Sequence, residues 1–123
     1  MAFLTDRKRA TGLGSAREGT HHHISMMVSS VALIILMPLF LLTFGRALGG
    51  GYDDILAYYA RPFPAIVAAL TIVVGFMHFN NGVRSAIEDY TGGMTRKAMI
   101  LLSTIVCYGA AAIGLFAIAK LAL

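Results

Sequence analysis

Three long apolar runs are the feature that most restricts how this chain can fold. They extend over about residues 24–44, 63–87 and 98–121. Each can cross the roughly 30 Å hydrocarbon core of a bilayer, because a helix rises about 1.5 Å per residue. A segment in lipid must be helical, since its backbone groups find no water to bond. The sequence therefore predicts an all-α integral membrane protein with three transmembrane helices.

The composition supports a membrane class and disfavours soluble ones. Only 13% of the 123 residues are charged, against roughly 25% in ordinary soluble domains. The net charge of +4 comes from basic residues that flank the apolar runs, a placement typical of membrane orientation and not of nucleic-acid binding. The single cysteine, Cys107, lies in the third run, where we expect it only to pack. We expect one membrane domain over residues 1–123 and no nucleic-acid partner.

Basic residues are distributed unevenly between the two ends of the predicted helices. Seven lie in the N-terminal arm or around the C-terminal end of the second run, and three lie in the first loop or near the C-terminal end of the third run. Because Lys and Arg are enriched on the cytoplasmic side, we expect the arm, residues 1–23, in the cytoplasm. The end of the second run is then cytoplasmic as well.

Proline, glycine and alanine indicate where the helices bend, end and pack. Pro38 predicts a bend inside the first run. The glycines at 49–51 predict a loop, and those at 92–93 predict the turn before the third helix. In the third run, the small residues Ala110 and Gly114 favour close packing against another helix.

His78 lies well inside the second run, at a depth where ionisable side chains are rare and usually functional. At about 100° per residue, four small or acidic residues share its face of the helix. These residues are Gly75, Gly82, Ser85 and Asp89. Glycines on both sides of a histidine leave room for a large flat ligand such as a porphyrin, which a face rich in Leu and Phe would block.

Three interpretations of His78 remain open from the residues alone. It can bond a neighbouring helix, relay protons in a channel or transporter, or ligate the iron of a b-type haem. The other histidines, His21, His22 and His23, lie at the mouth of the first run, so none shares the depth of His78. Ligation by two histidines therefore needs one from another chain, which makes this chain part of a larger helix bundle.

Other polar residues of the second run also need an explanation. Arg84 can extend to lipid headgroups, pair with Glu88 or hold a haem propionate. Acidic residues at a helix C-terminus oppose the macrodipole, so either the helix ends before Glu88 and Asp89 or these acids serve a purpose. Asn80 and Asn81 require hydrogen-bond partners if lipid surrounds them.

The stretch HFNNGVRSAIEDY, residues 78–90, resembles the second transmembrane helix of the small hydrophobic anchor subunits of succinate dehydrogenase, respiratory complex II. Its histidine, its glycine and arginine, and its final Asp-Tyr pair carry the resemblance. The segment GLGSAREGTHH, residues 12–22, resembles the segment that precedes the first helix in that family. The chain is most similar to alphaproteobacterial members, which implies a multi-pass protein of the bacterial inner membrane.

The resemblance implies a role for each matching residue. His78 would be one axial ligand of haem b, which is shared with the larger cytochrome b subunit. Tyr90 would donate a hydrogen bond to a ubiquinone carbonyl, supported by Asp89. The residues implied at or near the haem propionates are His21, His22, Gly82, Arg84 and Ser85. One departure is Met27, which stands where family members commonly carry a basic residue.

The resemblance also implies what the assembled complex does. The anchor would tether the flavoprotein and iron–sulfur subunits to the lipid bilayer, so that electrons pass from succinate to ubiquinone. FAD and the iron–sulfur clusters belong to those partners, and the anchor alone is not an enzyme. An anchor of a quinol:fumarate reductase, which runs the reverse reaction, remains an alternative. A proton-relay or transporter subunit is a further one, and the lack of other intramembrane carboxylates argues against it.

Overall fold

The computed structural model describes residues 5–11 and 19–123, and within these ranges every regular element is an α-helix. The helices are α1 (Asp6–Thr11), α2 (Gly19–Ala47), α3 (Tyr52–Tyr59), α4 (Pro62–Tyr90) and α5 (Gly93–Ala122). Of these, α2, α4 and α5 are long and apolar enough to cross a membrane. The prediction of an all-α protein with three transmembrane helices is confirmed. The segment 12–22 resembles the one before the first helix of the family, and its residues 12–18 lie outside the described residues.

The long helices extend beyond the apolar runs that predicted them. α2 begins at Gly19, so the three adjacent histidines belong to its first two turns. α4 continues to Tyr90, past the end of the second apolar run. α2 also remains helical on both sides of Pro38. A hydropathy pattern marks only the part of a helix that lipid can surround, and it does not detect polar turns that continue the same helix.

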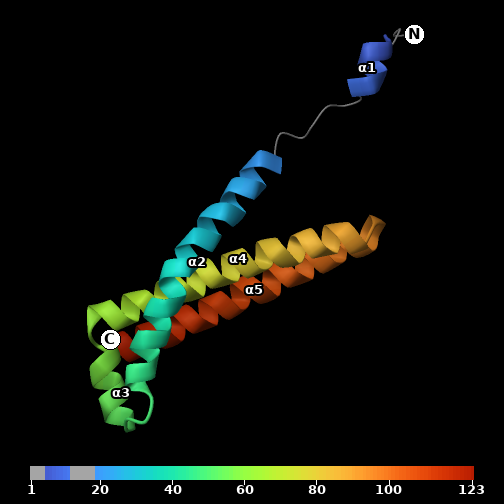
Figure 1. Ribbon diagram of the computed structural model, residues 1–123. Helices are drawn as coiled ribbons and strands as arrows, with labels where there is room; N and C mark the ends of the chain where they lie inside the picture. Colours follow the sequence, from blue (N-terminus) through green and yellow to red (C-terminus); the bar gives the residue numbers. More distant parts are fainter. Residues whose placement is uncertain (1–4, 12–18) are drawn as a thin grey trace.

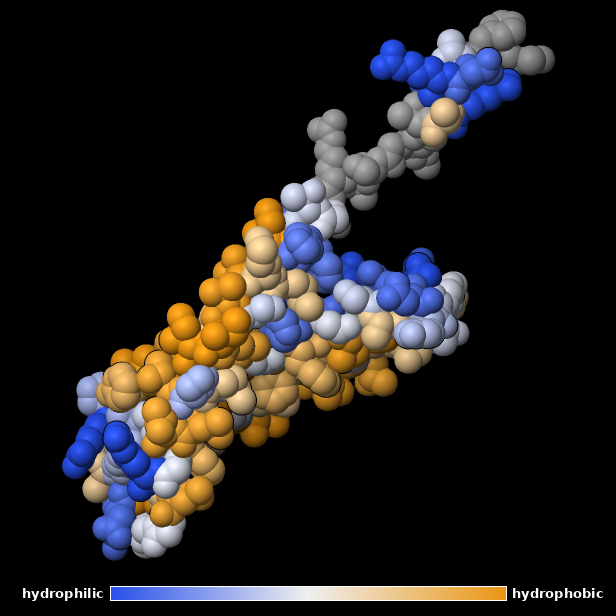
Figure 2. Space-filling model, in the orientation of Figure 1, coloured by the Kyte–Doolittle hydropathy of each residue, from blue (hydrophilic) through white to orange (hydrophobic). Residues whose placement is uncertain are grey.

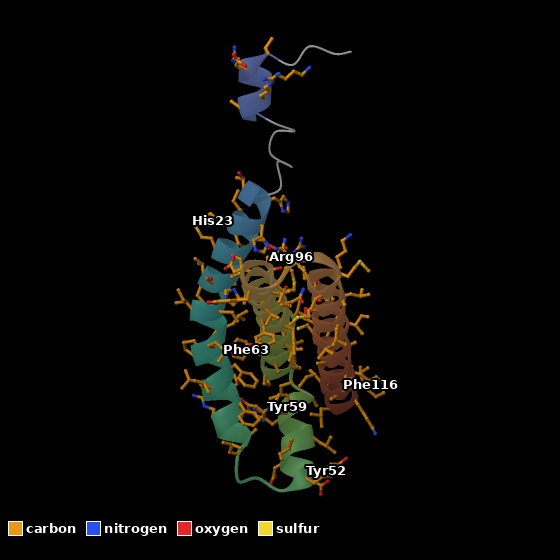
Figure 3. All side chains as sticks on the ribbon, turned by 90° about the vertical axis from the view of Figure 1, so that its right-hand side faces the viewer. His23, Tyr52, Tyr59, Phe63, Arg96 and Phe116 are labelled. Atoms are coloured by element: carbon orange, nitrogen blue, oxygen red, sulfur yellow. The ribbon has the colours of Figure 1, made fainter. Side chains whose placement is uncertain are left out.

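α4 is the central helix of the bundle. Both α2 and α5 pack along α4, and no Cα atom of α2 lies within 8 Å of one in α5. Figure 1 shows α4 and α5 side by side with α2 crossing them, and Figure 3 shows α4 between the other two. α4 and α5 run antiparallel because a tight turn at Gly92 and Gly93 joins them. Gly93 has a φ of 60°, which a residue with a side chain rarely adopts.

The contact between α4 and α5 depends on small side chains of α5. Cys107 and Ala111 are buried, and Gly114 continues their stripe one turn later. A Cβ atom added to Gly114 would lie 3.2 Å from Cδ1 of Ile72 on α4. The expectation that Gly114 permits close packing is thus confirmed, and Cys107 is a buried free thiol.

The short helix α3, which the sequence did not predict, closes the end of the bundle opposite the α4–α5 turn. It contacts all three long helices. Tyr59 is buried there with Ala47 and Ala68. The loop glycines predicted before it are present, and the backbone N–H of Gly51 donates to the carboxylate of Asp54 over 3.0 Å at the start of α3. Eight residues are too few for a helical hydropathy pattern to stand out from a loop.

The surface divides into an apolar middle and two polar ends. Figure 2 shows apolar side chains over the middle of the bundle and hydrophilic ones at both ends. In Figure 3, His23 and Arg96 lie at one end, whereas Tyr52 lies at the other. Large apolar side chains such as Ile34 and Ile113 are more than two-thirds exposed, at 71% and 72%. A surface of this kind needs lipid or partner helices to cover it.

Gly114→Leu should separate α4 from α5, because the added side chain meets Ile72. We expect a loss of about 1–3 kcal/mol in stability, typical of overpacking. The thiol of Cys107, which is 3% exposed, should then react faster with an alkylating reagent in native membranes, as measured by mass spectrometry. Gly109→Leu is the matched control, since a Cβ at Gly109 meets nothing within 4 Å. Equal alkylation rates in both variants would contradict the packing described above.

Candidate functional site

Three side-chain hydrogen bonds join α2 to α4. They pair His22 with Ser85, Ser25 with Asn81, and Ser29 with His78. Along each helix the three positions are three or four residues apart, so they lie on one face. Because α2 and α4 run in opposite directions, the two faces match residue by residue. We call these six residues the polar ladder.

His78 occupies the deepest position of the polar ladder. Its Nδ1 atom lies 2.9 Å from Oγ of Ser29, which is only 9% exposed. The Ser29 hydroxyl also donates to the backbone carbonyl of Met26 over 2.9 Å. The first interpretation of His78, a bond to a neighbouring helix, is therefore confirmed. An imidazole has a second ring nitrogen, Nε2, so this bond leaves a ligand role open.

The helix surface beside His78 is open at Gly75 and Gly82, as the sequence predicts. A Cβ atom added to Gly75 or Gly82 would meet nothing within 4 Å. Gly75 also opens onto an apolar cavity of about 430 Å³ between α2 and α4. The side chains and glycine that line it are Phe40, Thr71, Ile72, Gly75, Phe76 and Phe79. One imidazole beside open space and an apolar wall fits a flat macrocycle.

The donor set favours haem over a bare metal ion. Groups of three or more His, Cys, Asp or Glu side chains able to hold a metal are absent from residues 5–11 and 19–123. A haem iron already has four porphyrin nitrogens and needs only axial ligands from protein. His78 would supply one such ligand to a haem, and the second would then have to come from another chain.

A polar cavity of about 660 Å³ lies between the N-terminal part of α2 and the C-terminal part of α4. Its lining consists of Gly19, His21, His22, Ser25, Asn81, Arg84 and Glu88. Figure 2 shows hydrophilic side chains gathered in the hollow where these two helix ends diverge. The structure thus brings together His21, His22 and Arg84, which the sequence assigned to one site. His23 is exposed and is not among the lining residues.

Two arginine side chains, Arg84 and Arg96, form hydrogen bonds at the acidic C-terminal end of α4. Nε of Arg84 donates to Oε1 of Glu88 over 2.9 Å, which is one of the three interpretations given for Arg84. The interpretation that the helix ends before the acids is wrong, since α4 continues to Tyr90. Arg96 of α5 donates to the carbonyls of Thr91 over 2.8 Å and Glu88 over 3.0 Å. The two guanidinium groups therefore offset the charge of Glu88 and the negative end of the helix dipole.

Asp89 and Tyr90 lie at the tip of α4, and both are exposed. Tyr90 is 89% exposed, and Asp89 is exposed as well. Neither side chain has a hydrogen bond with any other residue that the structure describes. Twelve residues of helix separate Tyr90 from His78, which is about 18 Å along the axis. The tip and the histidine are therefore separate places on one helix.

The two asparagines of α4 differ in how they are satisfied. Asn81 donates to Ser25 over 3.4 Å and is part of the polar ladder, as its need for a partner predicted. Asn80 is only 8% exposed, and its Oδ1 atom has no hydrogen-bond partner among the described residues. For the Oδ1 atom of Asn80, the expectation of a partner is therefore not met within residues 5–11 and 19–123.

Sequence analysis missed the two serines of α2 in the polar ladder. Ser25 and Ser29 are four residues apart and follow His22 at a helical spacing. This periodicity was a usable signal, because hydroxyl groups on one face of an apolar helix indicate a polar neighbour. The residue that each serine would meet on α4 depends on helix register, which one sequence does not reveal.

Three long apolar helices, two of them joined by polar side-chain bonds, define a multi-pass membrane protein. The family model described as "Succinate dehydrogenase/Fumarate reductase transmembrane subunit" matches residues 2–116, and the chain belongs to this family. The Paracoccus denitrificans "Succinate dehydrogenase hydrophobic membrane anchor subunit" is 48% identical over 123 residues, covering 100% of this chain and 95% of the relative. A protein of the same name from Rickettsia conorii is 25% identical over 108 residues, or 85% of each chain. No solved structure matches.

Arg96→Gln should loosen the end of α4, because it removes two hydrogen bonds to the last carbonyl groups of the helix. We expect a local loss of about 1–2 kcal/mol, since each of the two hydrogen bonds has a net value of about 1 kcal/mol. Amide exchange of residues 88–92 in the membrane-embedded protein should accelerate several-fold. Lys97→Gln removes the same charge one residue later and should leave exchange unchanged. If both variants exchange alike, net charge and not capping stabilises this end.

Proposed function

We propose that this chain is the hydrophobic membrane anchor subunit of a succinate dehydrogenase and that it helps to bind haem b and ubiquinone. The observation that carries the proposal is His78, held inside the bundle beside two open glycine positions. The names of the relatives favour succinate oxidation over fumarate reduction. The proposed partners are the cytochrome b, iron–sulfur and flavoprotein subunits, the last two carrying the clusters and FAD.

The haem site combines residues at two depths. His78 offers one axial nitrogen, and the cytochrome b subunit supplies the other. His21, His22 and Arg84 line the polar cavity nearer the membrane surface, where their hydrogen-bond donors and positive charge suit propionate carboxylates. Ser85 orients His22 through the 3.1 Å contact between Oγ and Nε2, and Gly82 leaves the approach open. Haem b, when bound, supplies a one-electron redox centre.

The quinone site is at the tip of α4. The exposed phenol of Tyr90 donates a hydrogen bond to a ubiquinone carbonyl and stabilises negative charge that develops there during reduction. Asp89 is free to hold a basic group of a partner or to pass protons. Quinone reduction consumes protons, so a site at the membrane surface is chemically suitable.

We place residues 1–123 in the bacterial inner membrane as one domain, with the N-terminus cytoplasmic. The greater number of basic residues in the arm and near the α4–α5 turn supports this orientation. The tip of α4 then lies on the cytoplasmic side, where soluble subunits would deliver electrons. The arm, residues 1–23, would face the same side.

His78→Ala should abolish or alter the low-spin haem b spectrum of the purified complex, because an axial nitrogen is lost. Visible and electron paramagnetic resonance spectra, normalised to flavin, measure the effect. His23→Ala is the matched control, as this histidine is exposed and lies outside the polar cavity. An unchanged spectrum in the His78 variant would overturn the ligand assignment.

Tyr90→Phe should lower the rate of quinone reduction by about tenfold, the equivalent of a hydrogen bond worth about 1.4 kcal/mol in the transition state. Succinate oxidation with a soluble artificial acceptor should stay near the parent rate. Tyr52→Phe, at the other end of the bundle and 75% exposed, should change neither rate. A parallel fall of both activities in the Tyr90 variant would assign this residue a structural role.

A further inference from the structure

We propose that Ser29 is a positioning residue for His78, which it holds in the tautomer whose Nε2 atom can bind iron. This inference rests on the proposed haem ligation by His78. It concerns a residue of α2 that does not itself approach the metal. The position of the Ser29 hydroxyl proton determines which tautomer His78 adopts.

The Ser29 hydroxyl has two neighbours and only one proton. Its Oγ atom lies 2.9 Å from the carbonyl oxygen of Met26 and 2.9 Å from Nδ1 of His78. A carbonyl oxygen can only accept, so the bond to Met26 uses the hydroxyl proton. The proton of the bond to His78 must then come from Nδ1–H. In a neutral imidazole this leaves the lone pair on Nε2, the form that binds a metal.

Burial makes this arrangement difficult to replace. Ser29 is 9% exposed between α2 and α4, and His78 is half-buried opposite it. Without Ser29, an Nδ1–H group at this depth would lack an acceptor, and a buried donor left unbonded is unfavourable. No other hydrogen bond to the His78 ring occurs among the residues that the structure describes. Ser29 therefore sets both the proton position and the orientation of the ring.

The same bond affects the iron electronically. An Nδ1–H group that donates to an oxygen makes the imidazole a stronger electron donor. A stronger donor stabilises the oxidised iron and lowers the midpoint potential. Loss of the acceptor should therefore raise the potential and weaken haem retention, since partners behind metal ligands typically contribute about tenfold or more to affinity.

The chain offers a closely matched control next to Ser29. Ser30 donates its hydroxyl to the same Met26 carbonyl over 2.8 Å, but it makes no hydrogen bond with His78. Ser30→Ala therefore removes an equivalent bond from the same carbonyl and leaves the histidine untouched. Ser29→Thr keeps the hydroxyl and provides a conservative rescue.

The test measures haem content per flavin and the haem midpoint potential in the purified complex. Ser29→Ala should raise the potential and lower haem retention by about tenfold, while Ser30→Ala and Ser29→Thr should match the parent. An unchanged Ser29→Ala complex, or an equal shift in Ser30→Ala, overturns the inference. If Ser29→Ala does not assemble, Ser29→Cys decides, because the thiol is a weak acceptor of similar size. The haem midpoint potential of the Ser29→Cys complex should rise, and an unchanged midpoint potential overturns the inference.

The parallel His78→Ala variant separates this inference from the proposed function. If His78→Ala leaves the haem spectrum unchanged, haem ligation by this chain fails, and the role of Ser29 fails with it. If His78 is required but Ser29→Ala has no effect, the ligand assignment stands and only the positioning role is overturned.

Discussion

The lack of water in the bilayer core is the constraint on which the whole structure depends. Backbone groups meet it by forming helices. Polar side chains inside the membrane must form hydrogen bonds with one another. The polar ladder between α2 and α4 consists of such bonds. Each bond of the polar ladder gives a polar side chain the hydrogen-bond partner that lipid cannot provide. The same bonds hold α2 against α4.

α4 separates polar and apolar packing on its two sides. Toward α2 it presents His78, Asn81 and Ser85, which form hydrogen bonds. Toward α5 it presents apolar side chains such as Ile72, which pack closely against Gly114. Because the backbones of α2 and α5 do not come close to each other, large apolar faces remain uncovered. This architecture suits a chain that completes its packing with partner subunits and lipid.

The part of the site that could be predicted from helical periodicity lies on one helix, α4. The face shared by His78, Gly75 and Gly82 follows from helical periodicity, and the structure confirms the open space beside them. The grouping of His21 and His22 with Arg84 came from the family resemblance, and the polar cavity brings them together. The acids at the end of α4 were harder to interpret, because their compensation includes Arg96 of another helix.

The sequence by itself determined the three membrane helices, the depth of His78 and the small residues around it. These follow from hydropathy and from periodicity along a single helix, which neighbouring residues impose. Only the tertiary structure decided that Ser29 meets Nδ1 of His78 and that His22 meets Ser85. Such pairs depend on the register and rotation of one helix against another. That register is set by side-chain packing and bonding across the interface, over sequence separations that no local pattern records.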